Sequence, residues 1–224
     1  MTDVTTFPAQ RVGRHPERAR SERDHLDAVL DASLVGTLST VVDGWPWVVP
    51  MLYARVGDRI LVHGSTGAGA LRAVAAGAPV ALCVAVIDGL VVAHTTFESS
   101  ANYRSAVVSG HLERLTGAEQ EAALDHLSDR LVPGRNAEVR ATTKKERAQT
   151  LAMALPILDG QWTVKVRDDW SDLPEEETDA WVGIVPMRMV FDPPQTAPFS
   201  PAGAPVPPSV RALAERNEPA PVRA

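Results

Sequence analysis

Residues 34–63, LVGTLSTVVDGWPWVVPMLYARVGDRILVH, decide the fold. The dipeptide Asp43-Gly44 is a typical hairpin turn, and Gly57-Asp58 is a second turn signal. The runs between and beside these turns are rich in β-branched and aromatic residues, which favour strands. The stretch therefore predicts three antiparallel strands in hairpin succession, at Leu34–Val42, Trp45–Arg55 and Arg59–His63.

The chain on either side of this stretch adds more strands and a few helices. Capping boxes at Thr116-x-x-Glu119 and Thr143-x-x-Glu146 start helices that we expect to end at Pro133-Gly134 and near Ala154. Further helices are predicted from Pro16 to about Ser33, with Leu26, Val29 and Leu30 on one face, and over Ala70–Ala76. Further strands are predicted at Pro79–Ile87, at Leu90–Thr95 after an Asp88-Gly89 turn, and at Tyr103–Leu115, Ile157–Val166 and Trp181–Val190.

Strands in short succession with no alternating βαβ pattern predict a mainly β fold with peripheral helices, an antiparallel barrel or sandwich. We expect one domain over residues 16–191. We also expect residues 1–15 to form a flexible N-terminal segment and the Pro-rich residues 192–224 to form an extended or disordered tail.

Composition narrows the function classes. The chain has 224 residues, of which 45% are hydrophobic and 22% charged, as in ordinary globular domains. The net charge of −6 argues against nucleic acid as a partner. No apolar run approaches the roughly 20 residues of a membrane helix, and the N-terminus lacks a signal-peptide pattern, so we expect a cytoplasmic protein without membrane contact. Cys83 stands in an apolar run and is expected to be buried and inert.

Several sharp motifs are absent. Gly67-x-Gly69 begins like a dinucleotide fingerprint, but Arg72 stands where the third glycine belongs. No Walker lysine and no Gly-x-Ser-x-Gly elbow is present. The six histidines lack metal-site spacing, so no metal site is expected, and the catalytic residues remain unassigned.

The junction from His63 to Arg72 has the features of an anion site. A strand ends in Gly64-Ser65-Thr66 and leads into an Ala-rich helix, whose N-terminus offers free N–H groups and a positive dipole end. Ser65 and Thr66 add hydroxyl donors, Arg72 adds a guanidinium, and His63 sits at the rim. A phosphate fits such a junction, although glycine-rich turns also open helices for purely structural reasons.

Two other segments carry polar or irregular features. Pro50 interrupts a predicted strand, which can leave main-chain groups of Trp47–Pro50 free to bind the edge of a flat heteroaromatic ring; a β-bulge without ligand is the alternative. The run His94–Ser105 is polar and aromatic, and its Arg104 and Ser105 would suit a second phosphate clamp. Its alternative is a solvated connector.

Together these segments resemble a known family. The sequence is similar to the flavin-nucleotide-binding branch of the pyridoxamine 5′-phosphate oxidase-like FMN-binding split-barrel superfamily, the branch that includes the nitroimidazole-resistance proteins. The resemblance covers about residues 14–190. It rests on Asp43-Gly44-x-Pro46-x-Val48-x-Pro50, Leu61-x-His63-Gly64-Ser65, Asp88-Gly89-Leu90-Val91, Asn102-Tyr103-Arg104-Ser105-x-Val107-Val108-x-Gly110 and Trp181–Pro186.

The resemblance implies a six-stranded Greek-key split barrel, a homodimer, and FMN in a groove at the dimer interface. The motifs are not specific for a reaction, and our own hypothesis is a flavin-dependent oxidoreductase that acts on a small organic substrate, with NAD(P)H as a candidate electron donor. Residues carried over are His63, Ser65 and Thr66 near the phosphate and ribityl chain, Val48, Val49 and Pro50 beside the isoalloxazine with Thr37 and Ser39 on the next strand, and Asn102, Tyr103, Arg104 and Ser105 completing the pocket.

Arg72 is added to this set on physical grounds. Ala68 and Ala70 stand where the family often has a basic residue, which leaves the phosphate charge to Arg72 or Arg104. Three alternatives remain open: the same barrel with deazaflavin F420 or with haem, where haem needs an axial ligand such as His63 or His94; a non-catalytic flavin-binding or sensing protein; and an interaction module without cofactor.

Overall fold

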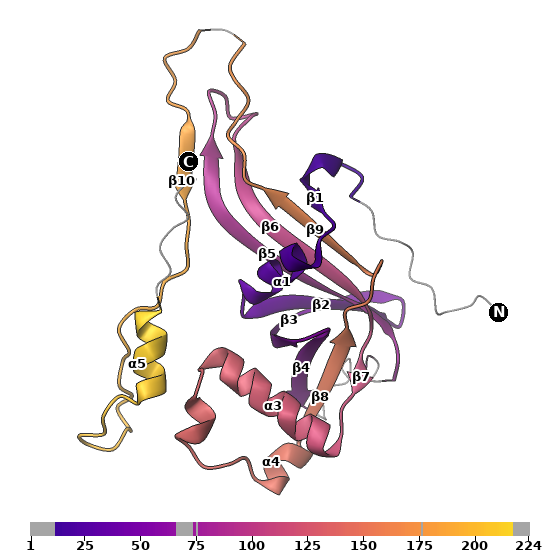
Figure 1. Cartoon of the computed structure of the whole chain (residues 1–224), viewed down its shortest axis with the longest axis vertical. Coiled ribbons are helices and arrows are strands. Elements are labelled where there is room, and N and C mark those ends of the chain that lie inside the picture. Colours follow the sequence, from indigo (N-terminus) through magenta and orange to yellow (C-terminus); the bar gives the residue numbers. More distant parts are fainter. Residues whose placement is uncertain (1–11, 66–73, 75, 176, 217–224) are drawn as a thin grey trace, which may run out of the picture.

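The structure is a computed structural model that describes residues 12–65, 74, 76–175 and 177–216 (Figure 1). These residues contain ten strands, all paired antiparallel, and the helices lie around them. The strands are β1 (Ala19–Arg20), β2 (Val35–Val42), β3 (Trp45–Val56), β4 (Arg59–Ser65), β5 (Pro79–Val92), β6 (Ser100–His111), β7 (Glu113–Arg114), β8 (Thr150–Pro156), β9 (Trp162–Arg167) and β10 (Gly183–Pro186).

The strand order is β1-β9-β6-β5-β2-β3-β4-β8-β7, with β10 on the free part of β5. Strand β5 returns beside β2, which gives the spatial order β5-β2-β3-β4 of a Greek key. In the described residues the two ends of the order, β1 and β7, do not pair, so the sheet is not closed. The prediction of a mainly β split barrel is confirmed, with ten strands in place of the predicted six.

The helices are short and peripheral. They are η1 (Pro16–Arg18), α1 (Arg23–Asp31), α3 (Gly117–Leu131), η2 (Arg135–Ala137), α4 (Lys144–Ala148) and α5 (Pro208–Glu215). The predicted first helix is split, because residues Ala19–Arg20 pair with β9 before α1 begins. The predicted helix over Ala70–Ala76 lies almost entirely outside the described residues.

The main core lies between α1 and one face of the sheet. Leu26, Val29 and Leu30 of α1 are fully buried, as their helical spacing predicts, and they join Leu38 and Tyr53 in one cluster. The Tyr53 hydroxyl donates a hydrogen bond to the Leu30 carbonyl oxygen, which ties α1 to β3. Each of these side chains contributes about 1.5–3 kcal/mol by burial. The same burial raises the pKa of Tyr53, so its hydroxyl stays protonated.

A second cluster lies under α3. Ala123 and Leu127 of α3 pack with Leu61, Ala152 and Ala154. Strand β8 is buried on both faces, because alternate side chains enter the main core and this second cluster. The capping box predicted at Thr116 does not form, since the Thr116 side chain makes no cap hydrogen bond.

Strand β5 runs straight through Asp88-Gly89, where the sequence predicted a turn. The register shifts between Ile87 and Gly89, and the ladder to β6 then continues to Val91. A Cβ at Gly89 would lie 3.0 Å from the Ile184 Cγ2 atom and from the Val185 carbonyl oxygen. The glycine therefore permits the close approach of β10, and the dipeptide forms a bulge in place of a hairpin turn.

The helix predicted to reach Ala154 ends at Ala148. Its capping box does form: the Glu146 N–H donates to the Thr143 hydroxyl, and the Glu146 carboxylate accepts from the Thr143 N–H. From Thr150 onward the chain instead pairs with β4 over seven residues. This ladder overrides the helical propensity, and the strand predicted at Ile157–Val166 is correspondingly shortened to β9.

Part of the Pro-rich tail is helical, whereas the sequence predicted an extended or disordered segment. Residues 208–215 form α5, which begins after Pro207. The Ser209 N–H and hydroxyl donate to the Glu138 carboxylate at 2.9 Å and 2.6 Å. These bonds lower the pKa of Glu138 and fix α5 beside η2. The domain boundaries remain predictions.

Candidate functional site

One face of the sheet brings together most of the predicted cofactor residues. Thr37 pairs with Pro50 on one side and with Cys83 on the other, and Ser39 pairs with Val48. Residues paired directly across a ladder point to the same side. We call this side the outer face. By the registers of β2, β3, β5 and β6, it carries Thr37, Ser39, Val48, Pro50, Cys83, Tyr103 and Ser105.

The alternation of β3 and β4 adds His63 and Ser65 to the same face. Ala54 lies four residues after Pro50, so the two side chains share a face. Ala54 pairs with Leu61, and His63 and Ser65 lie two and four residues after Leu61, so they share that face as well. The His63 Nδ1 atom is buried and has no hydrogen-bond partner. A buried ring nitrogen without a partner costs free energy unless a ligand or water satisfies it. This atom fits a role in ligand binding.

The prolines of β3 mark a free edge. Residues Trp45–Leu52 pair with β2, whereas β4 pairs only with Tyr53–Val56. In the described part of the chain no strand covers the other edge of residues 45–52. Pro46 and Pro50 have no N–H group, so they stand at the positions of β3 that do not donate to β2. Val48 lies between them at the same alternate positions, so its N–H points to the open edge. The strand carries no register shift, so the predicted interruption is an uncovered edge and not a bulge.

Three predicted residues lie on the opposite side of the sheet. The Val49 side chain packs against the main core. By alternation Asn102 and Arg104 share the side of Ala106 and Val108, which are core residues. The structure therefore divides the run Asn102–Ser105 between two faces and does not assemble it as one pocket wall.

Arg104, which the sequence predicted as a phosphate clamp, is paired with a carboxylate. Its Nε and Nη2 atoms donate to the Asp88 carboxylate at 2.9 Å and 2.7 Å. A bidentate pair of this kind engages the guanidinium fully on that side. The bulge in β5 makes the pair possible, because Asp88 is skipped by the ladder.

Asn102 is fully buried and bonded to a residue that the sequence analysis missed. Its Oδ1 atom accepts a hydrogen bond of 2.6 Å from Arg167 Nη1, while its Nδ2 atom is buried without a partner. Arg167 also donates to the carbonyl oxygens of Asp169 and Trp170. No spacing pattern in the sequence links Asn102 to Arg167, since 65 residues separate them.

The other half of the predicted phosphate site cannot be placed. Thr66 and Arg72 lie outside the described residues, and Ser65 is the last described position of that junction. The phosphate cradle stays a prediction beyond Ser65.

Cys83 is exposed in the single chain, which corrects the expectation of a buried thiol. It lies on the outer face beside Thr37. Partial desolvation raises the pKa of the thiol, so Cys83 stays protonated at neutral pH. The signal that could have revealed its position is the alternation of β5, in which Val80, Leu82 and Val84 are the buried residues.

The outer face is open and largely apolar. Val41 and Val48 are 63% and 59% exposed, and Val35, Leu52 and Ile87 are also exposed. An apolar surface of this kind on a globular chain marks a place where a partner or ligand binds. An open face encloses a ligand only where a second surface covers it.

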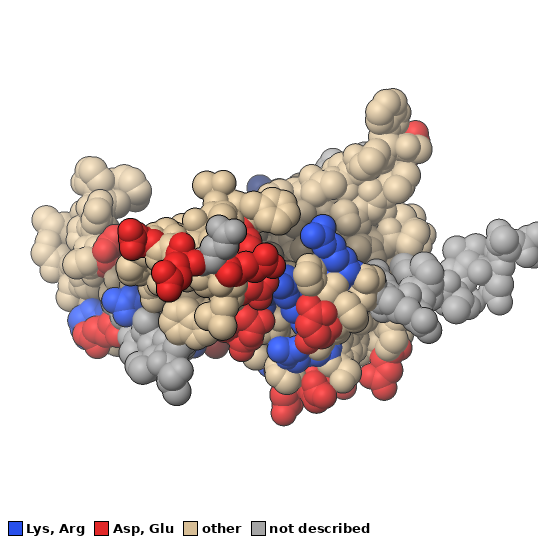
Figure 2. Space-filling view, turned by 90° about the horizontal axis from the view of Figure 1, so that it is seen from above, with Lys and Arg blue, Asp and Glu red and all other residues tan. Residues whose placement is uncertain are grey.

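Negative charge gathers away from this face, in the connection between β9 and β10. Figure 2 shows acidic side chains grouped on the molecule as seen from above, where this connection arches over the β5–β6 hairpin in Figure 1. Its described acidic residues are Asp168, Asp169, Asp172, Glu175, Glu177 and Asp179. A phosphate group would be repelled here, which favours the opposite end of the sheet at Ser65.

The β5–β6 connection carries the other histidine of interest. His94 Nδ1 lies 3.0 Å from Glu98 Oε2, and Ser99 and Thr95 fix the loop through hydrogen bonds to the main chain. Neither of these two atoms has a hydrogen-bond partner, so the contact does not orient the ring in the way that a hydrogen-bonded carboxylate does. No group of three or more metal-ligating side chains occurs among the described residues.

Comparison with known proteins identifies the relatives of this fold. The family model described as pyridoxamine 5′-phosphate oxidase matches residues 22–161. The FAD and haem binding protein from Mycobacterium smegmatis is 44% identical, with a TM-score of 0.85 over 88% of this chain and 97% of its own. The flavocytochrome Anf3 from Azotobacter vinelandii is 28% identical, with a TM-score of 0.82 over 90% of this chain and 94% of its own.

A more distant structure shares the fold. A putative 5-nitroimidazole antibiotic resistance protein from Bacteroides thetaiotaomicron is 17% identical, with a TM-score of 0.56 over 66% of this chain and 86% of its own. No protein of curated function matches the sequence. In the described part of the chain, none of the helices has the length and apolar character needed to cross a membrane.

Proposed function

Since the chain belongs to the pyridoxamine 5′-phosphate oxidase-like split-barrel family, we propose that it binds a flavin nucleotide on the outer face, between two copies of the chain. The observation that carries this proposal is the grouping of Thr37, Ser39, Val48, Pro50 and their neighbours on one open apolar face. A second copy on this face would supply the missing wall of the groove.

The residues of the outer face divide the work of holding a flavin. The N–H of Val48 and the carbonyl groups of the uncovered edge of β3 suit the hydrogen-bonding edge of the ring. The His63 Nδ1 atom is buried without a partner at the end of the face where Ser65 begins the phosphate junction. A bound flavin supplies electron transfer, and these residues bind it, orient it and exclude water.

We further propose an oxidoreductase that acts on a small organic substrate over the flavin, with NAD(P)H as the donor. Two proteins that share the fold and over a quarter of their residues with this chain are described as an FAD and haem binding protein and as a flavocytochrome. The cofactors that these descriptions name or imply, a flavin and a haem, are both groups that carry electrons. The sequence resemblance favours FMN, whereas the first relative binds FAD, and the two share the ring and its first phosphate.

Haem is a second candidate cofactor, favoured by the same two relatives and by two histidines here. His94 Nδ1 lies 3.0 Å from Glu98 Oε2, and neither atom has a hydrogen-bond partner. His63 has one ring nitrogen buried without a partner.

Absorption spectra and mass spectrometry of the ligand released from purified protein test both proposals. Flavin bands with released FMN or FAD support the first, and a Soret band with loss of that band in His94→Ala supports the second. A Soret band without flavin would overturn the flavin proposal. Oxidation of NAD(P)H by the loaded protein with an added acceptor distinguishes an oxidoreductase from a binding or sensing protein.

A variant pair tests the site itself. Ser65→Ala should weaken flavin binding by about ten- to a hundredfold, since a hydrogen bond to a charged group is worth about 1.5–3 kcal/mol. Ser128→Ala, an exposed serine on α3, is the matched control and should retain the flavin. Equal flavin content in both variants would contradict a phosphate position at Ser65.

A further inference from the structure

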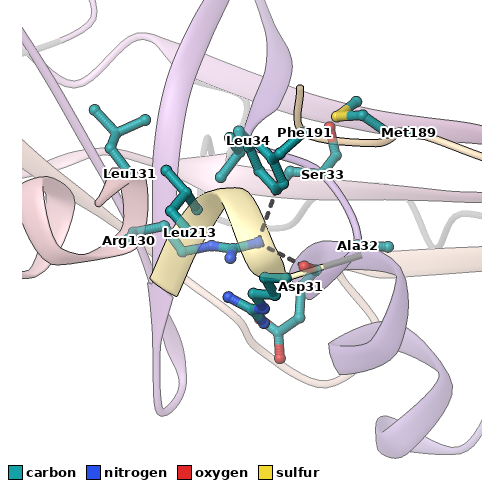
Figure 3. A pocket seen from close by; sticks show the side chains of 10 residues that line it. Asp31, Ala32, Ser33, Leu34, Arg130, Leu131, Met189, Phe191 and Leu213 are labelled. Carbon is teal, nitrogen blue, oxygen red and sulfur yellow. Dashed lines mark hydrogen bonds between the residues drawn. The ribbon is translucent and has the colours of Figure 1, made fainter. Parts of the chain in front are cut away.

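A cavity of about 180 Å³ lies apart from the outer face, where the ends of α1 and α3 meet the C-terminal segment. Figure 3 shows its lining, with Arg130 and Leu131 from α3, Leu34 at the position before β2, Phe191 from the C-terminal segment and Leu213 from α5. None of the predicted cofactor residues that the structure describes lines it.

The polar part of this cavity is the guanidinium of Arg130, which has a hydrogen-bond donor without an acceptor. Arg130 Nη2 donates to the carbonyl oxygens of Asp31 and Ser33 at the C-terminal end of α1 (Figure 3). The Arg130 Nε atom is buried and has no hydrogen-bond partner. A buried N–H on a charged group is costly to leave unsatisfied, so an acceptor is expected there.

The charge of Arg130 is also uncompensated by its neighbours. The nearest carboxylate of the lining, Asp31, is bound by both Nε and Nη2 of Arg55 and is thereby neutralised. Among the described residues no ion pair involves Arg130. Arg216 adds a second positive charge to the lining. The cavity therefore favours an anion.

The remaining walls are apolar, and the volume is small. Leu34, Leu131, Phe191 and Leu213 face the space together with Met189. Sites for drug-sized ligands and cofactors usually measure roughly 300–1,000 Å³, so this cavity is too small for a flavin or a haem. Its chemistry suits a short hydrocarbon or a single ring that ends in one negative group.

We propose that this cavity binds a small monocarboxylate. The carboxylate is attracted by the guanidinium groups of Arg130 and Arg216, and the hydrocarbon part packs against Leu34, Leu131 and Leu213. The C-terminal segment completes the site, because α5 supplies Leu213 and is held in place by the bonds of Ser209 to Glu138. Ligand binding therefore stabilises the docked position of α5.

Calorimetric titration of the full chain with hexanoate and with benzoate tests the proposal. We expect saturable binding of at least one of them, and binding of the uncharged hexanol about tenfold weaker or more. Arg130→Gln should weaken the carboxylate by a similar factor, while Arg114→Gln, a change at an exposed arginine of β7, should leave it unchanged.

A second variant covers the case in which Arg130→Gln disturbs folding. Leu213→Trp fills the cavity and leaves the bonds of Arg130 to Asp31 and Ser33 in place, so it should abolish binding in a folded protein. Hexanoate should also slow proteolysis between residues 192 and 216. The proposal is overturned by absence of binding for both acids, by unchanged affinity in Leu213→Trp, or by equal competition from inorganic phosphate. Flavin content plays no part in these readouts.

Discussion

The two faces of the same strands differ in what covers them. On the core face, Leu38, Leu82 and Val108 are fully buried against α1 and its neighbours. On the outer face, Val41 and Val48 are more than half exposed. The chain covers the core side of these strands by itself. On the outer side α3 covers Ala54 and Leu61, and the part of the face on β2, β5 and the first half of β3 is left open.

The residue types on the open side explain the difference. An antiparallel sheet with one wet face normally alternates apolar and polar residues. Here the outer positions of β5 are Ala81, Cys83, Ala85 and Ile87, with no charge among them. An exposed face without charged residues is typical of a surface that binds a partner or a ligand. We propose that a second copy of the chain covers it, with the cofactor between the two copies.

Substitution of adjacent residues on the two faces should give the largest difference. Leu82→Ala removes a fully buried side chain from the main core and should cost about 2–5 kcal/mol of unfolding free energy. Cys83→Ala, one residue along on the outer face, should cost less than about 1 kcal/mol. Urea denaturation monitored by circular dichroism measures both. Equal losses would break the distinction between the faces.

A charge on the outer face should dissociate the pair of chains without unfolding either one. Val48→Asp places a carboxylate in the centre of the proposed interface, and we expect the dimer dissociation constant to rise at least about thirtyfold, as for an interface hot spot. Val139→Asp, a change at another exposed valine, is the control. Sedimentation velocity measures the association, and a Val48→Asp protein that stays dimeric would place the interface elsewhere.

Loss of the Tyr53 hydroxyl should weaken the anchor of α1 on the core face. Tyr53→Phe leaves the buried Leu30 carbonyl oxygen without its donor, at a cost of about 1–3 kcal/mol. Because burial raises the pKa of Tyr53, the folded form keeps its proton at pH values where an unfolded tyrosine would begin to lose it. The contribution is therefore complete below the usual tyrosine range and declines as the pH rises above it. A wild-type protein with no such alkaline decline relative to Tyr53→Phe would contradict this role.

The smallest expected effect is on the rate at which Cys83 is alkylated, which measures whether the outer face is covered in solution. Desolvation raises the pKa of the thiol, so its reaction with iodoacetamide should be slow at neutral pH and accelerate as the pH rises above the usual cysteine range. A dimer should protect the thiol further, so dilution should speed the reaction. A rate independent of protein concentration would argue that this face is uncovered in solution.

The sequence predicted the fold well where the pattern is local. The hairpins of residues 34–63 and the buried stripe of Leu26, Val29 and Leu30 are present as expected. It failed where a distant segment decides the outcome. Asp88-Gly89 forms a bulge because β10 approaches Gly89, and residues 150–154 form a strand because β4 pairs with them.

The site shows the same limit. Thr37, Ser39, Val48 and Pro50 share a face as two-residue alternation requires. The division of Asn102–Ser105 between two faces follows from the same alternation, which a reading of the motif as one block overlooked. The pairing of Arg104 with Asp88 depends on the bulge in β5, and that bulge had been predicted as a turn.

The central claim is that the outer face joins two copies of the chain around a flavin. Size-exclusion chromatography with light scattering and visible absorbance tests it in one run. We predict a particle of about twice the 24.0 kDa chain mass that carries flavin absorbance, and a Val48→Asp protein that loses both the doubled mass and the absorbance. A single chain of 24.0 kDa that keeps its full flavin absorbance would contradict the account.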